Sequence, residues 1–274
     1  MRILQSFARP AAVMLASVAI LGLGACAGRN AGTRADTSYV ARDVGTLYTA
    51  AKREIDRGNY KRSAVIFDEV ERQHPYSVWA RRAQLMSAFS YYMAQDYTKA
   101  IESARRFLSV HPGNKDAPYA YYLIAMSYYE QIEDITRDQK ITQQALDALG
   151  ELSRRYPNTN YAADARVKMD LVTDHLAGKD MEIGRFYQVR GQWLAATIRF
   201  RNVVENYQTT SHVPEALMRL TESYLALGLR DEAQKSAAVL GANYPGTEWY
   251  QRSYELMQKY PAPMATAAAP ATGG

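Results

Sequence analysis

The sequence predicts an all-α protein, a superhelical stack of about five helix pairs. Three observations lead to this fold: an apolar helical face that recurs five times, a proline at a fixed distance after four of these faces, and a glycine in the turn of three pairs. Because one helix pair cannot bury its apolar face alone, such pairs stack on one another.

The second helix of each pair carries a small residue, with apolar or small residues four and seven positions later on the same helical face. The five small residues are Ser63, Ala100, Ala145, Ala196 and Ala233. Proline follows four of them after twelve positions, and Gln208 stands in its place after Ala196. The recurring proline marks the end of each unit.

The first helix of each pair repeats a small residue that is followed three positions later by a larger one. The small residues are Ala51, Ala88, Ala125, Gly184 and Thr221, and the larger ones are Glu54, Tyr91, Tyr128, Tyr187 and Tyr224. We expect the turn glycines to relieve backbone strain between paired helices; they are Gly58, Gly191 and Gly228. The whole pattern resembles the tetratricopeptide repeat.

The repeats are not evenly spaced along the chain. Residues beyond a regular repeat fall near 133–140 and at 161–180, and the latter segment is itself patterned as a helix.

The first 25 residues have the layout of a signal peptide. Arg2 and Arg9 precede an apolar run of about 14 residues, which would form a helix of about 21 Å, too short for a bilayer core of about 30 Å. The sequence LGAC at 23–26 resembles the bacterial lipobox, which implies that Cys26 becomes a first residue carrying diacylglycerol and an N-acyl chain. Ala27, where an Asp would imply retention at the inner membrane, implies an outer-membrane anchor facing the periplasm. The alternative is an ordinary signal peptide with an incidental cysteine.

The chain therefore divides into five parts along its length. These are a signal peptide (1–25), a lipidated tether (26–38), repeats one to three with a following helix (39–176), repeats four and five with a capping helix (177–260) and a disordered tail (261–274).

Charge and motifs argue against nucleic-acid binding and catalysis. From Cys26 onward there are 31 basic and 28 acidic side chains, a net charge of +3 that calls for no nucleic acid. The motifs of zinc peptidases, nucleotide-binding loops and serine hydrolases are absent from this part of the sequence. His74 and His111 each precede a repeat proline, so a turn explains both. We expect no catalytic site, no metal and no cofactor beyond the lipid on Cys26.

The concave positions of the first three repeats predict an aromatic groove for an extended client peptide. Its lining is Tyr48, Phe89, Tyr92, Tyr119, Tyr122, Met126 and Tyr129. Aromatic rings and methionine suit adaptable capture of apolar ligands. The alternative is that these rings are buried against an insertion or a neighbouring helix. The last two repeats are more polar at these positions, which suits a folded partner.

A lipoprotein with five such repeats resembles the BamD family, subunits of the β-barrel assembly machine of Gram-negative bacteria. The most specific segments are 60–83, 151–166 and 185–207. The resemblance implies a scaffold that binds the periplasmic domains of the barrel-forming subunit, accessory lipoproteins and unfolded outer-membrane proteins. It also implies partner binding by Arg199 and Arg185, although a solvated arginine explains Arg199 equally well. The second hypothesis is a periplasmic adaptor of the same fold that recruits cell-wall enzymes.

Overall fold

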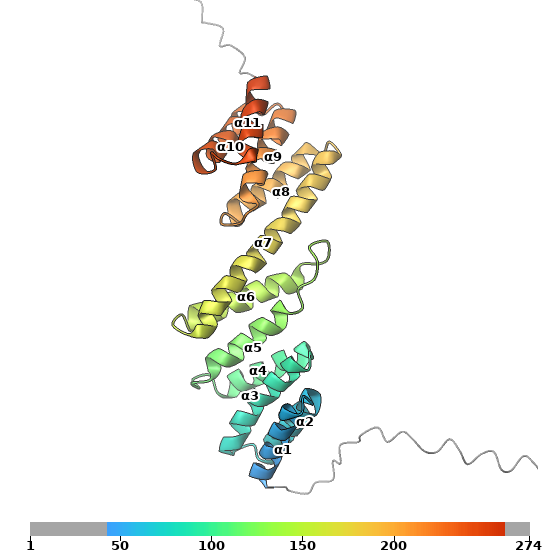
Figure 1. Cartoon of the computed structure of the whole chain (residues 1–274), viewed down its shortest axis with the longest axis vertical. Helices are drawn as coiled ribbons and strands as arrows, with labels where there is room; N and C mark the ends of the chain where they lie inside the picture. The colour runs from blue at the N-terminus through green and yellow to red at the C-terminus, as the bar shows by residue number, and fades with distance from the viewer. Residues whose placement is uncertain (1–42, 261–274) are drawn as a thin grey trace, which may run out of the picture. The chain divides into compact units, whose positions relative to one another are not determined.

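The computed structural model describes residues 43–260, whose regular structure is entirely α-helical (Figure 1). The signal peptide, the tether up to residue 38 and the tail from residue 261 lie outside the described residues. The helices are α1 (Val44–Asp56), α2 (Tyr60–Gln73), α3 (Val78–Met93), α4 (Tyr97–Val110), α5 (Ala117–Tyr129), α6 (Lys140–Arg155), α7 (Asn160–Val189), α8 (Trp193–Asn206), α9 (Val213–Ala226), α10 (Arg230–Asn243) and α11 (Glu248–Lys259).

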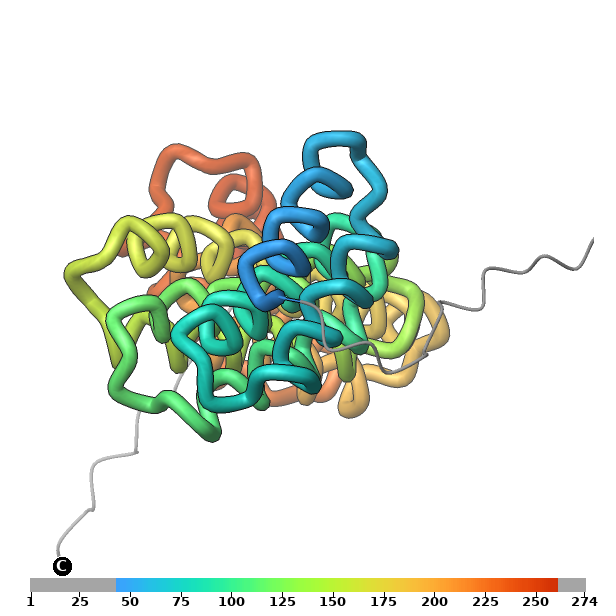
Figure 2. Tube along the Cα trace, turned by 90° about the horizontal axis from the view of Figure 1, so that it is seen from below, coloured from blue at the N-terminus to red at the C-terminus, as the bar shows by residue number. Residues whose placement is uncertain are grey.

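Each helix packs against the next one along the chain, so the described part is a stack of antiparallel helix pairs (Figures 1 and 2). The first helices of successive pairs also touch: α1 contacts α3, α3 contacts α5, and α5 contacts α7. The last helix, α11, covers α9 and α10. The predicted all-α stack of helix pairs is thereby confirmed.

The recurring small residues form the core of the stack. All five small residues of the second helices are completely buried, because neighbouring helices approach closest there. Seven positions later the larger apolar side chains are buried as well; these are Val70, Phe107, Leu152, Val203 and Leu240. The apolar period read from the sequence therefore marks the face that each second helix buries.

The prolines end one helix and help to begin the next. The residue before each repeat proline is the C-terminal cap of its helix, because proline disfavours a helical conformation in the residue that precedes it. Two positions after Pro75, Pro157 and Pro245 stands a serine or threonine whose hydroxyl accepts a hydrogen bond from the first turn of the following helix. These caps are Ser77, Thr159 and Thr247.

The turn glycines adopt the left-handed backbone expected of them. Gly58, Gly191 and Gly228 have φ of 77°, 71° and 74°. In the second repeat Gln95 takes the equivalent place with φ of 59°. A non-glycine residue is uncommon in this region, so this turn is the strained one of the four.

A ladder of tyrosine hydroxyls joins successive pairs. The hydroxyl of Tyr91 donates to Asp68 (2.7 Å), while those of Tyr128 and Tyr224 accept from arginines at 3.0 and 2.7 Å. Each partner stands 23 positions earlier in the chain, on the preceding second helix. In three of the five repeats the larger residue of the first-helix pattern is thus a contact between repeats.

The helix-patterned segment 161–180 and the first helix of the fourth repeat are one continuous helix, α7, of 30 residues. Its side chains up to Leu176 pack in a cluster with α5 and α6, whereas those from Ala177 onward pack with α8 and α9. The boundary that we placed between residues 176 and 177 lies inside this helix, where it passes from one cluster to the other. Gly178 does not interrupt α7, and a Cβ there would lie 3.2 Å from Nε2 of His212.

Candidate functional site

A cluster of tyrosines joins α3, α5 and the first half of α7. The rings of Tyr119 and Tyr122 lie 5.5 and 5.1 Å from the ring of Tyr161, centroid to centroid. Tyr92 extends the cluster on α3 and Tyr129 extends it on α5. We call these five residues the tyrosine cluster. All five are partly exposed, with Tyr161 at 36%.

A carboxylate and a lysine on α7 hold the cluster in place. Asp164 accepts a hydrogen bond from the hydroxyl of Tyr122 (2.9 Å) and pairs with the ammonium of Lys168 (3.0 Å). That ammonium lies 5.5 Å from the ring centroid of Tyr129, within cation–π range. On the other side, the hydroxyl of Tyr92 lies 3.4 Å from a carboxylate oxygen of Glu130.

Burial and nearby carboxylates raise the pKa of two hydroxyls of the cluster, those of Tyr92 and Tyr122. Burial, and then the nearby carboxylate of Glu130, raise the pKa of Tyr92 to about 12. Burial and the hydrogen bond to Asp164 raise the pKa of Tyr122 still further. Burial alone would raise the pKa of Asp164, but the hydrogen bonds from Lys168 and Tyr122 outweigh it and lower that pKa. At neutral pH the rings of Tyr92 and Tyr122 are therefore neutral, and the ion pair of Asp164 with Lys168 lies beside that of Tyr122.

The other three predicted groove residues lie apart from this cluster or beneath it. Tyr48 packs on the rings of Phe67 and Trp79 (5.3 and 4.8 Å) in the first two repeats. Phe89 is half-buried against the core of α3 to α5. Met126 was expected on the groove surface, but only 6% of it is exposed, because α5 is enclosed by α3, α4, α6 and α7.

Sequence reasoning missed Tyr161, Asp164 and Lys168. These residues stand three and four positions apart, a spacing that places them on one face of a helix. This spacing can be read from the sequence, but segment 161–180 is interpreted there as an insertion and not as part of the groove. Tyr161 packs on Tyr119 and Tyr122, and these rings remain partly exposed.

The two predicted partner-binding arginines are each held by a carboxylate. Arg185 on α7 donates to Glu215 on α9 (3.1 Å to both oxygens), and Arg219 donates to the same carboxylate (2.6 Å). Burial of Glu215 would raise its pKa, but the hydrogen bonds and charges of these arginines outweigh it and lower that pKa. Arg199 on α8 pairs with Asp180 on α7 (3.1 Å) and keeps 42% of its side chain exposed.

Two apolar side chains of α8, the helix that carries Arg199, face solvent. Leu194 and Ile198 on α8 are 66% and 62% exposed. At the end of α7, Val189 is 87% exposed. Leu194 and Ile198 stand four positions apart on one face of α8, and exposed apolar side chains on one face commonly mark a protein–protein contact.

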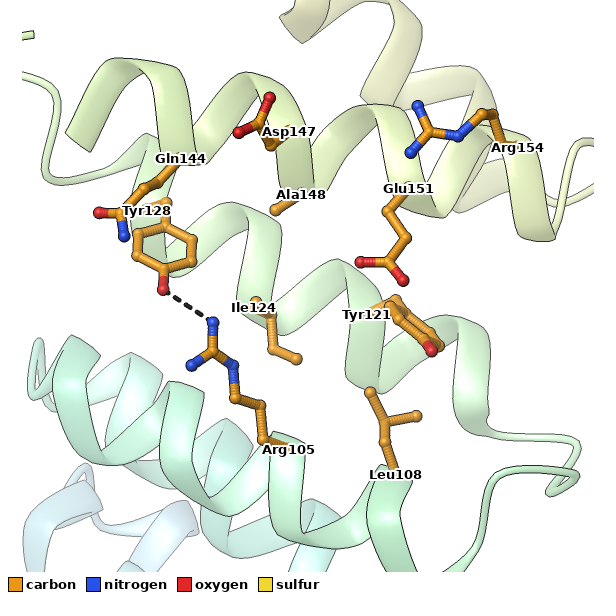
Figure 3. A pocket seen from close by; sticks show the side chains of 10 residues that line it. All are labelled: Arg105, Leu108, Tyr121, Ile124, Tyr128, Gln144, Asp147, Ala148, Glu151 and Arg154. Carbon is orange, nitrogen blue, oxygen red and sulfur yellow. Dashed lines mark hydrogen bonds between the residues drawn. The ribbon is translucent and has the colours of Figure 1, made fainter. Parts of the chain in front are cut away.

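A cleft that the sequence did not predict lies between α4, α5 and α6, with a volume of about 510 Å³ (Figure 3). Leu108, Ile124 and Ala148 are its apolar lining, and Arg105 crosses it to donate to the hydroxyl of Tyr128. Tyr121, at its edge, directly precedes Tyr122 in α5. Successive residues leave a helix about 100° apart, so the cleft and the tyrosine cluster use different faces of α5.

Within residues 43–260 no three His, Cys, Asp or Glu side chains come together as they would to hold a metal ion. None of the helices in this part of the chain is both long and apolar enough to cross a membrane.

A family model described as YfiO, outer membrane lipoprotein, matches residues 41–240. The chain belongs to this family. It is 49% identical to the outer membrane protein assembly factor BamD of Caulobacter vibrioides, over 94% of this chain and 83% of that protein. It is 42% identical to the BamD of Rickettsia prowazekii, over 90% of this chain and 97% of that protein. The predicted resemblance is thereby confirmed, as is the assignment to the outer membrane lipoproteins.

A solved helical-repeat structure also aligns with the chain. The tetratricopeptide-repeat protein TTC0263 of Thermus thermophilus covers 78% of this chain and 98% of its own, with 19% identity and a TM-score of 0.36.

Proposed function

We propose that this lipoprotein is a periplasmic scaffold in a machine that assembles and inserts outer-membrane β-barrel proteins, and that the tyrosine cluster binds the aromatic signal of an unfolded client. The observation that carries the proposal is the half-buried tyrosine cluster. The chain that holds it belongs to a family whose relatives are named outer membrane protein assembly factors. Tyr48 and Phe89 extend the aromatic surface towards the first repeats, and Met126 supports it from beneath.

The cluster has the properties that an extended aromatic segment requires. Tyrosine offers a large, rigid contact area at low cost in side-chain entropy. Asp164 holds the ring of Tyr122 by a hydrogen bond, and Lys168 lies over the ring of Tyr129. Because these side chains are already ordered, binding a client costs little further side-chain entropy. An aromatic client side chain would pack against these rings edge to face or with offset stacking.

Anchoring to the outer membrane is assigned to acylation of Cys26. Each buried CH₂ of an acyl chain contributes about 0.8 kcal/mol, so three chains hold a protein to a leaflet far longer than one. The anchor keeps the groove at the membrane into which the clients are inserted.

The surface around Arg199 is assigned to the periplasmic domains of the barrel-forming subunit. The exposed Arg199, Leu194 and Ile198 give α8 a mixed apolar and cationic exposed surface, a character that interfaces share. Arg185 belongs to the polar face between α7 and α9, which suits a folded partner of complementary charge, including accessory lipoproteins.

Co-purification from detergent-solubilised outer membranes tests this function. A large β-barrel protein as the main partner supports the assembly role. A cell-wall hydrolase in its place would support the adaptor hypothesis and contradict ours.

Arg199→Glu tests the partner surface, with Asp180→Asn as its matched control. Loss of one member of a buried charge pair in an interface typically costs about 2–5 kcal/mol of binding, so Arg199→Glu should lose the barrel subunit. Asp180→Asn breaks the same intramolecular ion pair and leaves the arginine in place, so it should retain the subunit. Equal loss in both variants would show that the effect comes from α7–α8 packing.

A further inference from the structure

The turn between α1 and α2 carries a concentration of positive charge. Residues 52–62 contain five basic and two acidic side chains, a net charge of +3. Residues 43–260 as a whole contain 28 basic and 27 acidic side chains, so the rest of this part of the chain carries −2. We call the five basic residues the basic corner; they are Lys52, Arg53, Arg57, Lys61 and Arg62.

The fold directs this charge outward. Ala51 and Ser63 are buried where α1 and α2 meet, and all five basic side chains are exposed. Glu54 is 6% exposed and pairs with Arg57 (2.8 Å) and more loosely with Arg62 (3.9 Å). The structure shows no ion pair between the other three basic residues and any residue of 43–260.

A hollow of about 540 Å³ lies against the corner, between the α1–α2 turn and the end of α3. Lys61 and Arg62 line it together with Asn59, whose amide donates to Glu54 (2.9 Å). Tyr60 and Met93 also line it, and Met93 is 39% exposed. The hollow thus has a cationic wall and room for an anionic group.

We propose that the basic corner binds anionic lipid headgroups of the leaflet that holds the acyl anchor, and so turns the α1–α2 end of the stack towards the membrane. The proposal rests on the acylation of Cys26 proposed above. The 16 residues between Cys26 and Asp43 let Asp43 lie at most about 60 Å from the acylated cysteine. The 13-residue helix α1 adds about 20 Å, so the corner stays within about 80 Å of the leaflet.

The chemistry of the corner favours a lipid surface over an acidic protein. Interface cores are depleted in charged residues, whereas the five defining side chains of the corner are all cationic and all exposed. Basic side chains beside an anchor each strengthen attachment to an anionic membrane by about fivefold. Because the acyl chains already hold the protein at the membrane, the effect of the corner is to orient the α1–α2 end of the stack towards the leaflet.

The test follows the reactivity of two lysines in the full-length acylated protein. The protein is reconstituted in vesicles of phosphatidylcholine, with or without phosphatidylglycerol, and acetylation of each lysine is measured by mass spectrometry. Lys52 and Lys61 should react at least about fivefold more slowly on phosphatidylglycerol vesicles. High salt should abolish this protection. Lys235 on α10, with 70% of its side chain exposed, is the internal reference and should not change.

Charge reversal at one corner residue supplies the matched pair of variants. Arg53→Glu should reduce the protection of Lys52 and Lys61 by about fivefold or more, while Arg81→Glu, an exposed position on α3 with the same charge change, should preserve it.

Equal reactivity of both lysines on the two kinds of vesicle would overturn the proposal. Protection by polyglutamate but not by phosphatidylglycerol would overturn it in favour of an acidic polypeptide. Loss of the protein from phosphatidylcholine vesicles would contradict the acylation of Cys26. In that case only the basic corner could bind the chain to phosphatidylglycerol vesicles. A chain that also failed to bind those vesicles would contradict the lipid-binding proposal as well.

Discussion

Gly184 marks a close approach of α7 to α8, and alanine in its place should destabilise the protein. A Cβ at this position would overlap the ring of Phe200, which is completely buried. Since the ring has no free space around it, the helices must move apart, and overpacking of this kind typically costs about 1–3 kcal/mol. Alanine regains about 1 kcal/mol of helix propensity. The expected net loss in the free energy of unfolding is therefore up to about 2 kcal/mol.

The assay is urea unfolding of Gly184→Ala beside Gly150→Ala. A Cβ at Gly150 on α6 would lie 3.2 Å from the end of the Arg154 side chain, which can swing away, and 3.8 Å from Cε of Met169, an ordinary van der Waals contact. This control should gain up to about 1 kcal/mol. Adding Phe200→Leu to Gly184→Ala should cost less than Phe200→Leu costs alone, because the two sites are in contact. Equal stabilisation by both alanines would refute the close packing of α7 on α8.

Three further predictions concern the anchor, the tyrosine ladder and alkaline pH. Cys26→Ser should leave an unlipidated precursor that no longer fractionates with the outer membrane, and a mature N-terminus other than acylated Cys26 in mass spectra would contradict the anchor. Tyr224→Phe removes the hydrogen bond from Arg201 and should lower the free energy of unfolding by about 1 kcal/mol. The control Tyr254→Phe, at an exposed position, should change this free energy by less than about 0.5 kcal/mol. Equal losses in both variants would mean that the tyrosine ladder contributes nothing to stability. The folded state raises the pKa of Tyr92 from 10.0 to about 12, so its contribution to stability is complete below pH 10 and is lost as the pH rises towards 12. Its tyrosinate absorbance should therefore appear late in an alkaline titration that preserves the helices, and ionisation at pH 10 would contradict this.

The repeat architecture could be predicted because close helix packing leaves a periodic trace in the sequence. Ala100, Ala145, Ala196 and Ala233 are small since a neighbouring helix occupies the space of a larger side chain. The turn glycine Gly58 likewise records a backbone conformation that most residues avoid. Such constraints act on neighbouring residues, so a single sequence is enough to predict them.

The site was only partly predictable, because its contacts join residues far apart in the sequence. Tyr122 meets Asp164 from 42 positions away, and nothing local in either segment shows that α7 returns to α5. The burial of Met126 depends on four surrounding helices, and the pairing of Arg199 with Asp180 depends on how α8 lies against α7. The continuity of α7 was missed since the repeat pattern suggested separate helices.

The central claim is that the tyrosine cluster receives the aromatic end of a client strand. Binding of a C-terminal barrel-strand peptide to Tyr122→Ala and Tyr121→Ala, with thermal melting of both variants, tests it most directly. The two tyrosines are neighbours on α5, but Tyr121 borders the cleft of Figure 3 and not the cluster. We predict that Tyr122→Ala weakens peptide binding by at least about thirtyfold per folded molecule, the effect of losing a hot-spot aromatic, while Tyr121→Ala leaves it unchanged. Lowered melting temperatures with unchanged affinity in both variants would contradict the claim.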